Sequence, residues 1–255
     1  PEYEHFKATM IAWLSMKELQ FSGASVTIPH KENLLRFVSE QGGEIEPLAA
    51  KIGAANTLTV RDDGSLYASN SDYAAALDAV CDAMKITRED LKEKRVAVLG
   101  AGGAARAIVA GFAQYGATVV IYNRTLDKAK ALADQYADLP GKIVAAPLEN
   151  LCKSCCEIYI NCTPQGMHPN VDTSPLPMTP DGKLDMQDLG PGVVVFDTVY
   201  NPVQTKLLRD AKAAGCLTVP GTEMFVRQAA AQFKGWTGHD APMQTFHAVL
   251  NERLK

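Results

Sequence analysis

The spacing of apolar residues along this chain changes near residue 90. Before that point, short β-rich runs alternate with stretches whose apolar residues recur every three or four positions, as Phe6, Met10 and Leu14 do. The polar turn at 61–64, which ends in glycine, is typical of a β-hairpin. The pattern predicts helices within 1–19, 31–38 and 72–84, and strands at 24–28, 54–60 and 65–68.

From residue 95 onward, compact apolar strands alternate with helices of about ten residues. This alternation is typical of βαβ units around a parallel sheet. The predicted strands are 95–99, 118–122, 143–146, 157–161, 193–197 and 217–219, and the predicted helices are 104–115, 126–136, 205–214, 224–236 and 242–254.

The two patterns of apolar spacing together predict an α/β protein with two domains. We expect a smaller α/β domain at 1–83 and a Rossmann-type parallel sheet at 90–222. The last helices, at 223–255, are expected to pack back on the first domain. Because ligands of such proteins commonly bind between domains that close on them, we expect the active site in the interdomain cleft.

The composition excludes several classes of protein. Hydrophobic residues make up 47% and charged residues 21% of the 255 positions, as in ordinary globular proteins. The net charge of −4 gives no general attraction to nucleic acids or anionic membranes. No apolar run approaches the roughly 20 residues that span a bilayer. The first residues lack a secretory pattern and the six cysteines lack paired spacing, so we expect reduced thiols and a cytoplasmic location.

Four cysteines raise the question of a metal site. Cys152, Cys155, Cys156 and Cys162 lie close together, and His168 follows them. A structural zinc site needs four ligands in a closed tetrahedron, usually from two separated pairs, whereas these cysteines lie in one short stretch. We interpret them as ordinary small apolar residues and expect no metal.

A glycine-rich turn marks a candidate nucleotide site. The segment Gly100-Ala101-Gly102-Gly103-Ala104-Ala105-Arg106 joins a predicted strand to a predicted helix. In such a turn the first glycine permits a sharp bend and the second lets the backbone approach a pyrophosphate, while Ala105 takes the place of the third. A plain tight turn is the alternative, but the strand–turn–helix context favours a dinucleotide site.

The choice of dinucleotide is expected to be encoded about 20 residues further on, at the end of the next strand. An acid there would bind the ribose hydroxyls of NAD, but this chain has Asn123-Arg124-Thr125. Arg124 can pair with a 2′-phosphate, and Lys128 can add a second positive charge. A solvated loop arginine is the alternative. The pattern favours NADP as the cofactor.

Ordered motifs along the chain resemble those of shikimate dehydrogenases. Ser25-Val26-Thr27-Ile28-Pro29-His30-Lys31 is followed by Gly53-Ala54-Ala55-Asn56-Thr57 and by Asn70-Ser71-Asp72, all upstream of the glycine turn. Further matching segments are 161–167, 197–202 and 221–225 with Gln228, so the resemblance extends from about residue 21 to residue 237. It implies reversible, NADP-dependent reduction of 3-dehydroshikimate to shikimate, a step of the shikimate pathway toward chorismate and the aromatic amino acids.

The resemblance also implies roles by position. Lys31 and Asp72 would act on the reacting oxygen. The residues implied to contact the substrate are Thr27, Asn56, Asp72, Tyr200 and Gln228. The residues implied to line the cofactor are Gly100, Ala101, Gly102, Gly103, Ala104, Ala105, Asn123, Arg124, Thr125, Thr163 and Met224, to which the charge argument adds Lys128.

Elementary chemistry supports the lysine–aspartate pair separately. Hydride transfer to a ketone builds negative charge on oxygen, so a positioned group must supply a proton. Lys31 directly follows a strand–proline turn, which would hold it near the end of the sheet. Taken alone, Lys31 could be a surface lysine at a helix start and Asp72 a first-turn acid of the next helix. Beside a dinucleotide site, we interpret both as catalytic.

The resemblance is incomplete at the N-terminus. Shikimate dehydrogenases usually begin with a strand and a Ser-x-Ser loop that holds the substrate carboxylate, and nothing upstream of Pro1-Glu2-Tyr3 supplies them here. We therefore expect residues 1–255 alone to bind NADP but to bind and turn over shikimate poorly. In some organisms this activity is fused behind a dehydroquinate dehydratase, so a fused partner domain is a further hypothesis, as is a plastid location for a plant protein.

Two other functions stay open at this point. A quinate/shikimate dehydrogenase that uses NAD would be favoured by an acid at position 123, where this chain has asparagine. A non-catalytic NADP-binding paralogue would be favoured by loss of Lys31 or Asp72, and both are present. A small-molecule substrate is the expected partner, with neither nucleic acid nor a membrane.

Overall fold

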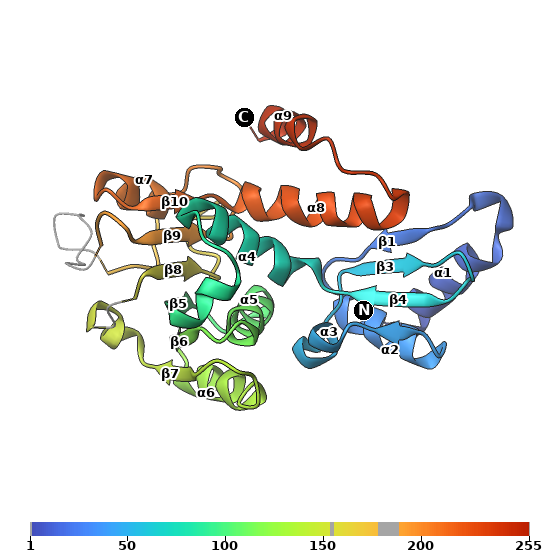
Figure 1. The fold of residues 1–255 in the computed structure, drawn as a ribbon, viewed down its shortest axis with the longest axis horizontal. Coiled ribbons are helices and arrows are strands. Elements are labelled where there is room, and N and C mark those ends of the chain that lie inside the picture. The colour runs from blue at the N-terminus through green and yellow to red at the C-terminus, as the bar shows by residue number, and fades with distance from the viewer. Residues whose placement is uncertain (1, 154–155, 178–188, 255) are drawn as a thin grey trace. The chain divides into compact units, whose positions relative to one another are not determined.

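The computed structural model describes residues 2–153, 156–177 and 189–254, with the backbone alone at 152 and 153. Within these residues the chain forms two compact units (Figure 1). Unit 1 contains Pro1–Asp72 and Gln228–Ala241, and unit 2 contains Tyr73–Arg227 and Pro242–Lys255. Each unit is therefore assembled from two separate stretches of the sequence.

These bounds differ from the domain bounds expected from the sequence, which lie at 83–90 and at 222. Most of α4 (Ser71–Met84) and the first turns of α8 (Gly221–Thr237) belong to unit 2. The last helix, α9 (Met243–Arg253), is also part of unit 2. The difference arises because both breaks fall inside helices, whose apolar periodicity gives no sign of a boundary.

Unit 1 is built on a sheet that has four strands in the described part of the chain. They are β1 (Gly23–Ser25), β2 (Glu44–Ile45), β3 (Thr57–Val60) and β4 (Leu66–Ser69), in the order β1-β3-β4-β2. β3 pairs antiparallel with β1 and β4, and β2 runs parallel to β4. Apolar side chains of the sheet pack with those of α1 (Tyr3–Ser15) and α2 (Lys31–Glu40). Two shorter helical elements of this unit are η1 (Lys17–Leu19) and α3 (Pro47–Ile52).

The sheet of unit 1 differs from its sequence prediction in two respects. The apolar pattern predicts strands over 24–28 and 54–60, whereas the paired residues end at Ser25 and begin at Thr57. Just before β3, Ala55 N donates to Lys31 O at 3.0 Å. The backbone before Thr57 therefore bonds to the first residue of α2 and does not extend the strand. The short elements β2 and α3 are not predicted, although a first-position proline and a following left-handed Gly53 mark α3.

Unit 2 is built on a parallel sheet that has six strands among the described residues. They are β5 (Arg95–Leu99), β6 (Thr118–Tyr122), β7 (Ile143–Ala146), β8 (Ile158–Asn161), β9 (Val194–Asp197) and β10 (Leu217–Val219). Their order is β10-β9-β8-β5-β6-β7. Read from β7, this is the order of a Rossmann dinucleotide-binding sheet. The sequence prediction of a Rossmann-type sheet is confirmed, with strand bounds that agree to within one residue.

The strands of unit 2 are predictable because most of them are buried on both faces. β8 and β9 are buried throughout, which gives the continuous apolar runs typical of parallel sheets. The connecting elements are η2 (Glu89–Glu93), α5 (Gly103–Gln114), α6 (Leu126–Gln135), η3 (Leu148–Lys153) and α7 (Lys206–Ala213). Among the helices described, none combines the length and apolar character needed to cross a membrane.

The strand order reverses between β5 and β8. The chain proceeds from β5 through β6 to β7 on one side and from β8 through β9 to β10 on the other. In open parallel sheets, ligands bind in the crevice outside the carboxyl ends of the strands at such a point. The glycine turn that follows β5 therefore begins where a dinucleotide is expected to bind (Figure 1).

Candidate active site

The lysine and aspartate identified from the sequence form an ion pair in unit 1. Lys31 is the first residue of α2, and Asp72 lies in the first turn of α4. Lys31 Nζ donates a hydrogen bond to Asp72 Oδ2 at 2.5 Å. The Lys31 side chain is 27% exposed and that of Asp72 is 10% exposed. Because an ammonium group has three donors, Lys31 can reach a ligand oxygen while Asp72 holds it in place.

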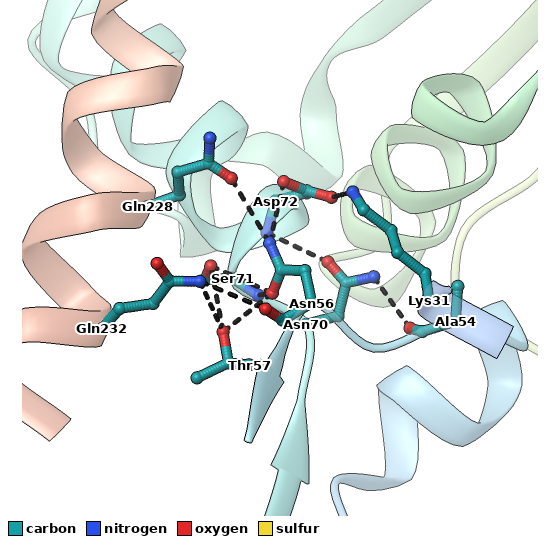
Figure 2. Close-up of polar contacts among 9 residues, drawn as sticks. All are labelled: Lys31, Ala54, Asn56, Thr57, Asn70, Ser71, Asp72, Gln228 and Gln232. Atoms are coloured by element: carbon teal, nitrogen blue, oxygen red, sulfur yellow. Dashed lines mark hydrogen bonds and ion pairs between the residues drawn. The ribbon is translucent and has the colours of Figure 1, made fainter. Parts of the chain in front are cut away.

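Asn56 ties the carboxylate of this pair to its surroundings (Figure 2). Its Nδ2 donates to Asp72 Oδ1 at 3.0 Å and to Gln228 Oε1 at 3.3 Å. Its Oδ1 accepts hydrogen bonds from Thr57 Oγ1 at 2.8 Å and from Ser71 N at 2.9 Å. A carboxylate only accepts and a backbone N–H only donates, so the Asn56 amide has a single favourable orientation. Asn56 is buried, and this orientation is therefore set by the protein.

Asn70 holds Asp72 at the start of α4, a role that the sequence analysis does not assign. Asn70 Oδ1 accepts a hydrogen bond from Asp72 N at 3.0 Å, as a side chain does that caps a helix N-terminus. Asn70 Nδ2 donates to Ala54 O at 2.9 Å (Figure 2). The next residue, Ala55, donates its N–H to Lys31 O. The backbone of Ala54 and Ala55 is thereby hydrogen-bonded both to Lys31 and to Asn70, the residue that caps the helix of Asp72.

The end of α8 contributes further contacts to this network. Gln232 Nε2 donates to Thr57 Oγ1 at 3.0 Å (Figure 2), and Trp236 Nε1 donates to Leu58 O at 2.8 Å. The resemblance points to Gln228 but not to Gln232 or Trp236. The three residues follow one another at intervals of four on one face of the helix, and that spacing is the signal that could have identified them.

Two further predicted substrate residues have exposed side chains. Thr27 is exposed, and its carbonyl accepts a hydrogen bond from His30 N at 2.9 Å. Tyr200 belongs to unit 2 and is 46% exposed, with its ring 5.3 Å from the ring of Phe225. Both side chains are accessible to a ligand. Phe225 has no role in the sequence prediction, and its packing against Tyr200 is a finding of the structure.

In unit 2, Gly100 occupies a position that requires glycine. Its φ is +111°, in the region that side chains rarely adopt. A Cβ there would lie 3.1 Å from Cys162 O and 3.2 Å from Thr163 Cγ2. Gly100 N donates to Tyr122 O at 2.7 Å. The turn after β5 is thus packed closely against the segment that follows β8.

The N-terminus of α5 fits a pyrophosphate. Gly102 is the N-cap residue and supplies no side-chain cap, and positions 102–104 are exposed. A Cβ at Gly102 or Gly103 would meet no other described atom within 4 Å. Uncapped N–H groups at a helix start bind anions. Ala105 is fully buried, as the third position of the motif requires for the packing of helix on sheet.

The candidate 2′-phosphate site lies at the end of β6, the neighbour of β5. Arg124 and Lys128 are exposed, and neither forms an ion pair within the described residues. Asn123 Nδ2 donates to Thr125 O at 2.8 Å, which folds the segment into a turn. Two positive charges are therefore available close to the glycine turn, and nearby carboxylates do not neutralise them.

The two remaining predicted cofactor residues lie on separate segments of unit 2. Thr163 follows β8, and its hydroxyl donates to Asn161 Oδ1 at 2.7 Å while its methyl group faces Gly100. Met224 is half-buried near the start of α8. At Gly221, a Cβ would lie only 2.5 Å from Val199 O, so the start of α8 packs against the segment after β9.

The cysteines form no metal site in the described part of the chain, where no group of three or more His, Cys, Asp or Glu side chains is placed to hold a metal. Cys155 lies outside the described residues, and the side chain of Cys152 is not described. Burial raises the pKa of the Cys162 thiol, and the nearby carboxylate of Asp197 raises it further. His168 is exposed.

Comparisons with known proteins decide the family. Three family profiles match the chain. Residues 3–58 match the shikimate dehydrogenase substrate binding domain, residues 82–165 match shikimate/quinate 5-dehydrogenase, and residues 221–250 match the shikimate 5′-dehydrogenase C-terminal domain. A shikimate dehydrogenase (NADP(+)) of Methanocella arvoryzae is 40% identical over 253 residues, which are 98% of this chain and 85% of that protein. The chain belongs to the shikimate dehydrogenase family.

Further relatives agree with this assignment. Shikimate 5-dehydrogenase from Thermus thermophilus, crystallised with NADP(H) and shikimate, has a TM-score of 0.79 and 28% identity, covering 100% of this chain and 86% of that chain. A bifunctional 3-dehydroquinate dehydratase/shikimate dehydrogenase of Arabidopsis thaliana is 37% identical over 243 residues, 91% of this chain and 38% of that protein. The family, the α/β fold and the oxidoreductase class predicted from the sequence are confirmed.

Proposed function

We propose that this shikimate dehydrogenase homologue catalyses the reversible, NADP-dependent reduction of 3-dehydroshikimate to shikimate. One observation carries the proposal: a family member holds both the Lys31–Asp72 ion pair and a strand–glycine turn–helix nucleotide site. A paralogue that had lost the reaction would be expected to lose one of these parts. The named activity of the relatives, and the NADP in their names, support the same reaction.

The chemistry assigned to unit 1 is proton transfer at the reacting oxygen. Bound NADPH supplies the hydride. As the carbonyl oxygen gains negative charge, Lys31 Nζ donates its proton to it. Asp72 Oδ2 accepts a hydrogen bond from that nitrogen and so aims it. In the reverse direction, the same nitrogen receives the proton of the hydroxyl group. Stabilisation by a positioned donor commonly contributes about 10²–10⁴-fold to such a rate.

Two amides of the network have different capacities for a substrate. Both N–H groups of Asn56 are engaged, one by Asp72 and one by Gln228. In the described part of the chain, no hydrogen bond engages Gln228 Nε2, whose two donors suit a polyhydroxylated ring. We therefore assign Gln228 to a substrate hydroxyl and Asn56 chiefly to the positioning of Asp72. Thr27 and Tyr200 complete the proposed substrate contacts.

The cofactor assignment depends on unit 2. The exposed start of α5, Gly100 to Ala105, would hold the pyrophosphate, and Arg124 with Lys128 would bind the 2′-phosphate. The side chains of Asn123 and Thr125, with Thr163 and Met224, would line the rest of the site. The absence of an acid at the end of β6 favours NADP over NAD.

Substitution of Arg124 tests the cofactor and the reaction together. The unaltered protein is assayed with shikimate and quinate, each with NADP and with NAD, and we expect the highest kcat/KM for shikimate with NADP. Arg124→Ala should raise the KM for NADP on the order of ten- to a hundredfold, because a charge-assisted pair contributes about 1.5–3 kcal/mol. The KM for NAD should not change. Lys130→Ala is the matched control, since it removes an exposed positive charge from α6, the helix that begins just after Arg124.

Three results would overturn the assignment. Equal loss of NADP and NAD binding in Arg124→Ala would place the arginine outside the 2′-phosphate site. Preference of the unaltered protein for quinate with NAD would favour the alternative dehydrogenase. A failure to oxidise either compound, with NADP still bound, would favour the non-catalytic paralogue.

A cytoplasmic or plastid location and a fused dehydroquinate dehydratase stay predictions. The bifunctional Arabidopsis relative is described as chloroplastic and has both enzyme activities in its name. The full reading frame around the present chain would test both predictions, because a dehydratase domain or a transit peptide would be encoded there.

A further inference from the structure

A buried polar cluster lies at the carboxyl edge of the sheet in unit 2. Asn161 ends β8, Asp197 ends β9, and Thr205 is the N-cap of α7. All three are fully buried. The strand register pairs Asn161 with Asp197, and β8 is the strand next to β5 at the point where the order reverses. The proposed reaction makes no use of this cluster, although it lies at the edge where the dinucleotide is expected.

Asp197 accepts three hydrogen bonds. Oδ1 accepts from Asn161 Nδ2 at 2.9 Å and from Val199 N at 3.0 Å, and Oδ2 accepts from Thr205 Oγ1 at 2.6 Å. In the regions that the structure describes, no lysine or arginine forms an ion pair with it. Burial raises the pKa of Asp197 to about 6, against the lowering effect of its hydrogen bonds. An acid kept ionised at neutral pH in such surroundings has a cost in stability.

Asn161 connects the Asp197 carboxylate to the segment after β8 through hydrogen bonds. Its Nδ2 donates both to Asp197 and to Gln165 O, at 3.2 Å. Its Oδ1 accepts from Thr163 N at 2.9 Å and from Thr163 Oγ1 at 2.7 Å. An amide turned the other way would set donor against donor at Thr163 and acceptor against acceptor at Asp197. The carboxylate therefore fixes the amide, and the amide fixes Thr163.

The same carboxylate fixes the segment after β9. Val199 N donates to it, and Val199 precedes Tyr200 in the chain. Thr198 donates through N at 3.0 Å and through Oγ1 at 2.8 Å to the carbonyl of Asn161. The start of α8 rests on this segment, since a Cβ at Gly221 would lie 2.7 Å from Thr198 O. The glycine turn rests in a similar way on the segment after β8. Both segments are therefore packed closely against neighbouring backbone.

We propose that Asp197 is a positioning residue that sets the cofactor-side segment at Thr163 and the substrate-side segment at Tyr200 from one buried carboxylate. The proposal rests on the proposed function, because it takes Thr163 to line the cofactor and Tyr200 to contact the substrate. It gives a reason for a buried acid that has no ion-pair partner among the described residues: an ionised carboxylate accepts at both oxygens, whereas a neutral side chain of the same shape must also donate.

The test is Asp197→Asn, which keeps the shape and removes the charge. Thr205→Val removes one donor to the carboxylate, and Thr205→Ser restores it. Three quantities are measured for each: the Kd for NADPH from its fluorescence, the KM for shikimate and the Tm at neutral pH. Asp78→Asn is the control, because Asp78 is an acid of unit 2 whose ion pair with Arg88 has no proposed part in binding.

We expect Asp197→Asn to raise both the NADPH Kd and the shikimate KM on the order of tenfold or more, since small misplacements of binding groups are costly. Its Tm should not fall. Thr205→Val should shift both constants in the same direction and Thr205→Ser should recover them, whereas Asp78→Asn should lower only the Tm.

Two outcomes would overturn the positioning role. One is an unchanged Kd and KM in Asp197→Asn. The other is that binding weakens only where the Tm also falls, and that Thr205→Ser binds as weakly as Thr205→Val. That result would mean a merely structural role. Because the NADPH titration needs no turnover, an inactive parent protein would count against the proposed reaction, and the NADPH Kd values of the variants would still test whether Asp197 positions the cofactor-side segment.

Discussion

At the scale of single residues, the charged groups of this protein are held in two opposite ways. Lys31 and Asp72 neutralise each other at 2.5 Å with part of the lysine exposed. Asp197 is fully buried and has hydrogen-bond donors but no cation among the residues that the structure describes. The first arrangement suits a group that must reach a ligand. The second suits a group that must not move.

The burial of Asp197 has a consequence for stability against pH. The folded-state pKa is raised from 3.8 to about 6, so folding favours the protonated form. The stabilisation is fully present below the unfolded pKa of 3.8 and is lost as the pH rises through about 6. Because a shift of one unit corresponds to about 1.4 kcal/mol, the free energy of unfolding should lose about 3 kcal/mol over this range through Asp197.

Urea unfolding followed by circular dichroism at pH 4 to 7 checks this expectation. Compared with Asp197→Asn, the native protein should lose relative stability between about pH 4 and 6, with little further change above pH 7. Cys162 is the titratable neighbour of Asp197, and burial keeps its thiol protonated throughout. A difference between the two proteins that is constant over the range, or that grows in favour of the native protein, would contradict the raised pKa.

Individual residues also mark where sequence reasoning succeeds. Lys31 and Asp72 are identified because the resemblance places each on a distinct motif, and the structure brings them into contact. Gln232 is missed because its partner Thr57 lies 175 positions away in the chain: the spacing along α8 places Gln232 on the same helix face as Gln228 but does not give the contact. Asn70 is missed because a helix-capping asparagine looks the same whether or not its neighbour is functional.

At the scale of elements, the two sheets differ in how clearly the sequence predicts them. The strands of unit 2 are mostly buried on both faces and give compact apolar runs, so their bounds follow from the pattern. In unit 1, β2 has only two residues and α3 six. Such short elements do not complete a period of either pattern, and tertiary contacts determine them.

The seating of α8 on β3 is an element-level prediction. Trp236 Nε1 donates to the carbonyl of the buried Leu58, and Gly23 leaves the space for the indole, since a Cβ at that position would overlap with Nε1. Trp236→Phe keeps most of the ring and removes the donor. It should lower the free energy of unfolding by about 0.5–1.5 kcal/mol, because the buried carbonyl loses a hydrogen bond.

The measurement is urea unfolding followed by the fluorescence of the remaining tryptophan, Trp13. The control is Trp13→Phe, in which the substituted side chain is 39% exposed and Trp236 becomes the probe. We expect less than about 0.5 kcal/mol for this surface change. Equal stability of the two variants would mean that the Trp236 hydrogen bond does not help to seat the helix.

At the scale of the whole molecule, the chain builds each unit from separate stretches of sequence. Unit 1 needs Gln228–Ala241 from the far end of the chain to complete its polar network, and unit 2 takes up the helix after that segment. The sequence predicts two α/β parts but not this exchange, because it depends on contacts distant in the chain. The lysine–aspartate pair belongs to unit 1 and the glycine turn to unit 2, and the proposed reaction uses both.

Substitution of Lys31 tests the central claim most directly. Lys31→Met keeps the aliphatic stem and removes the ammonium group, and Lys17→Met is the matched change of a lysine outside the network. NADPH formation from NADP and shikimate gives kcat, and a fluorescence titration gives the Kd for NADPH. We predict that kcat falls about 10²–10⁴-fold in Lys31→Met alone while the Kd stays within about twofold. A Lys31→Met protein that retained more than about a tenth of the native kcat would contradict it.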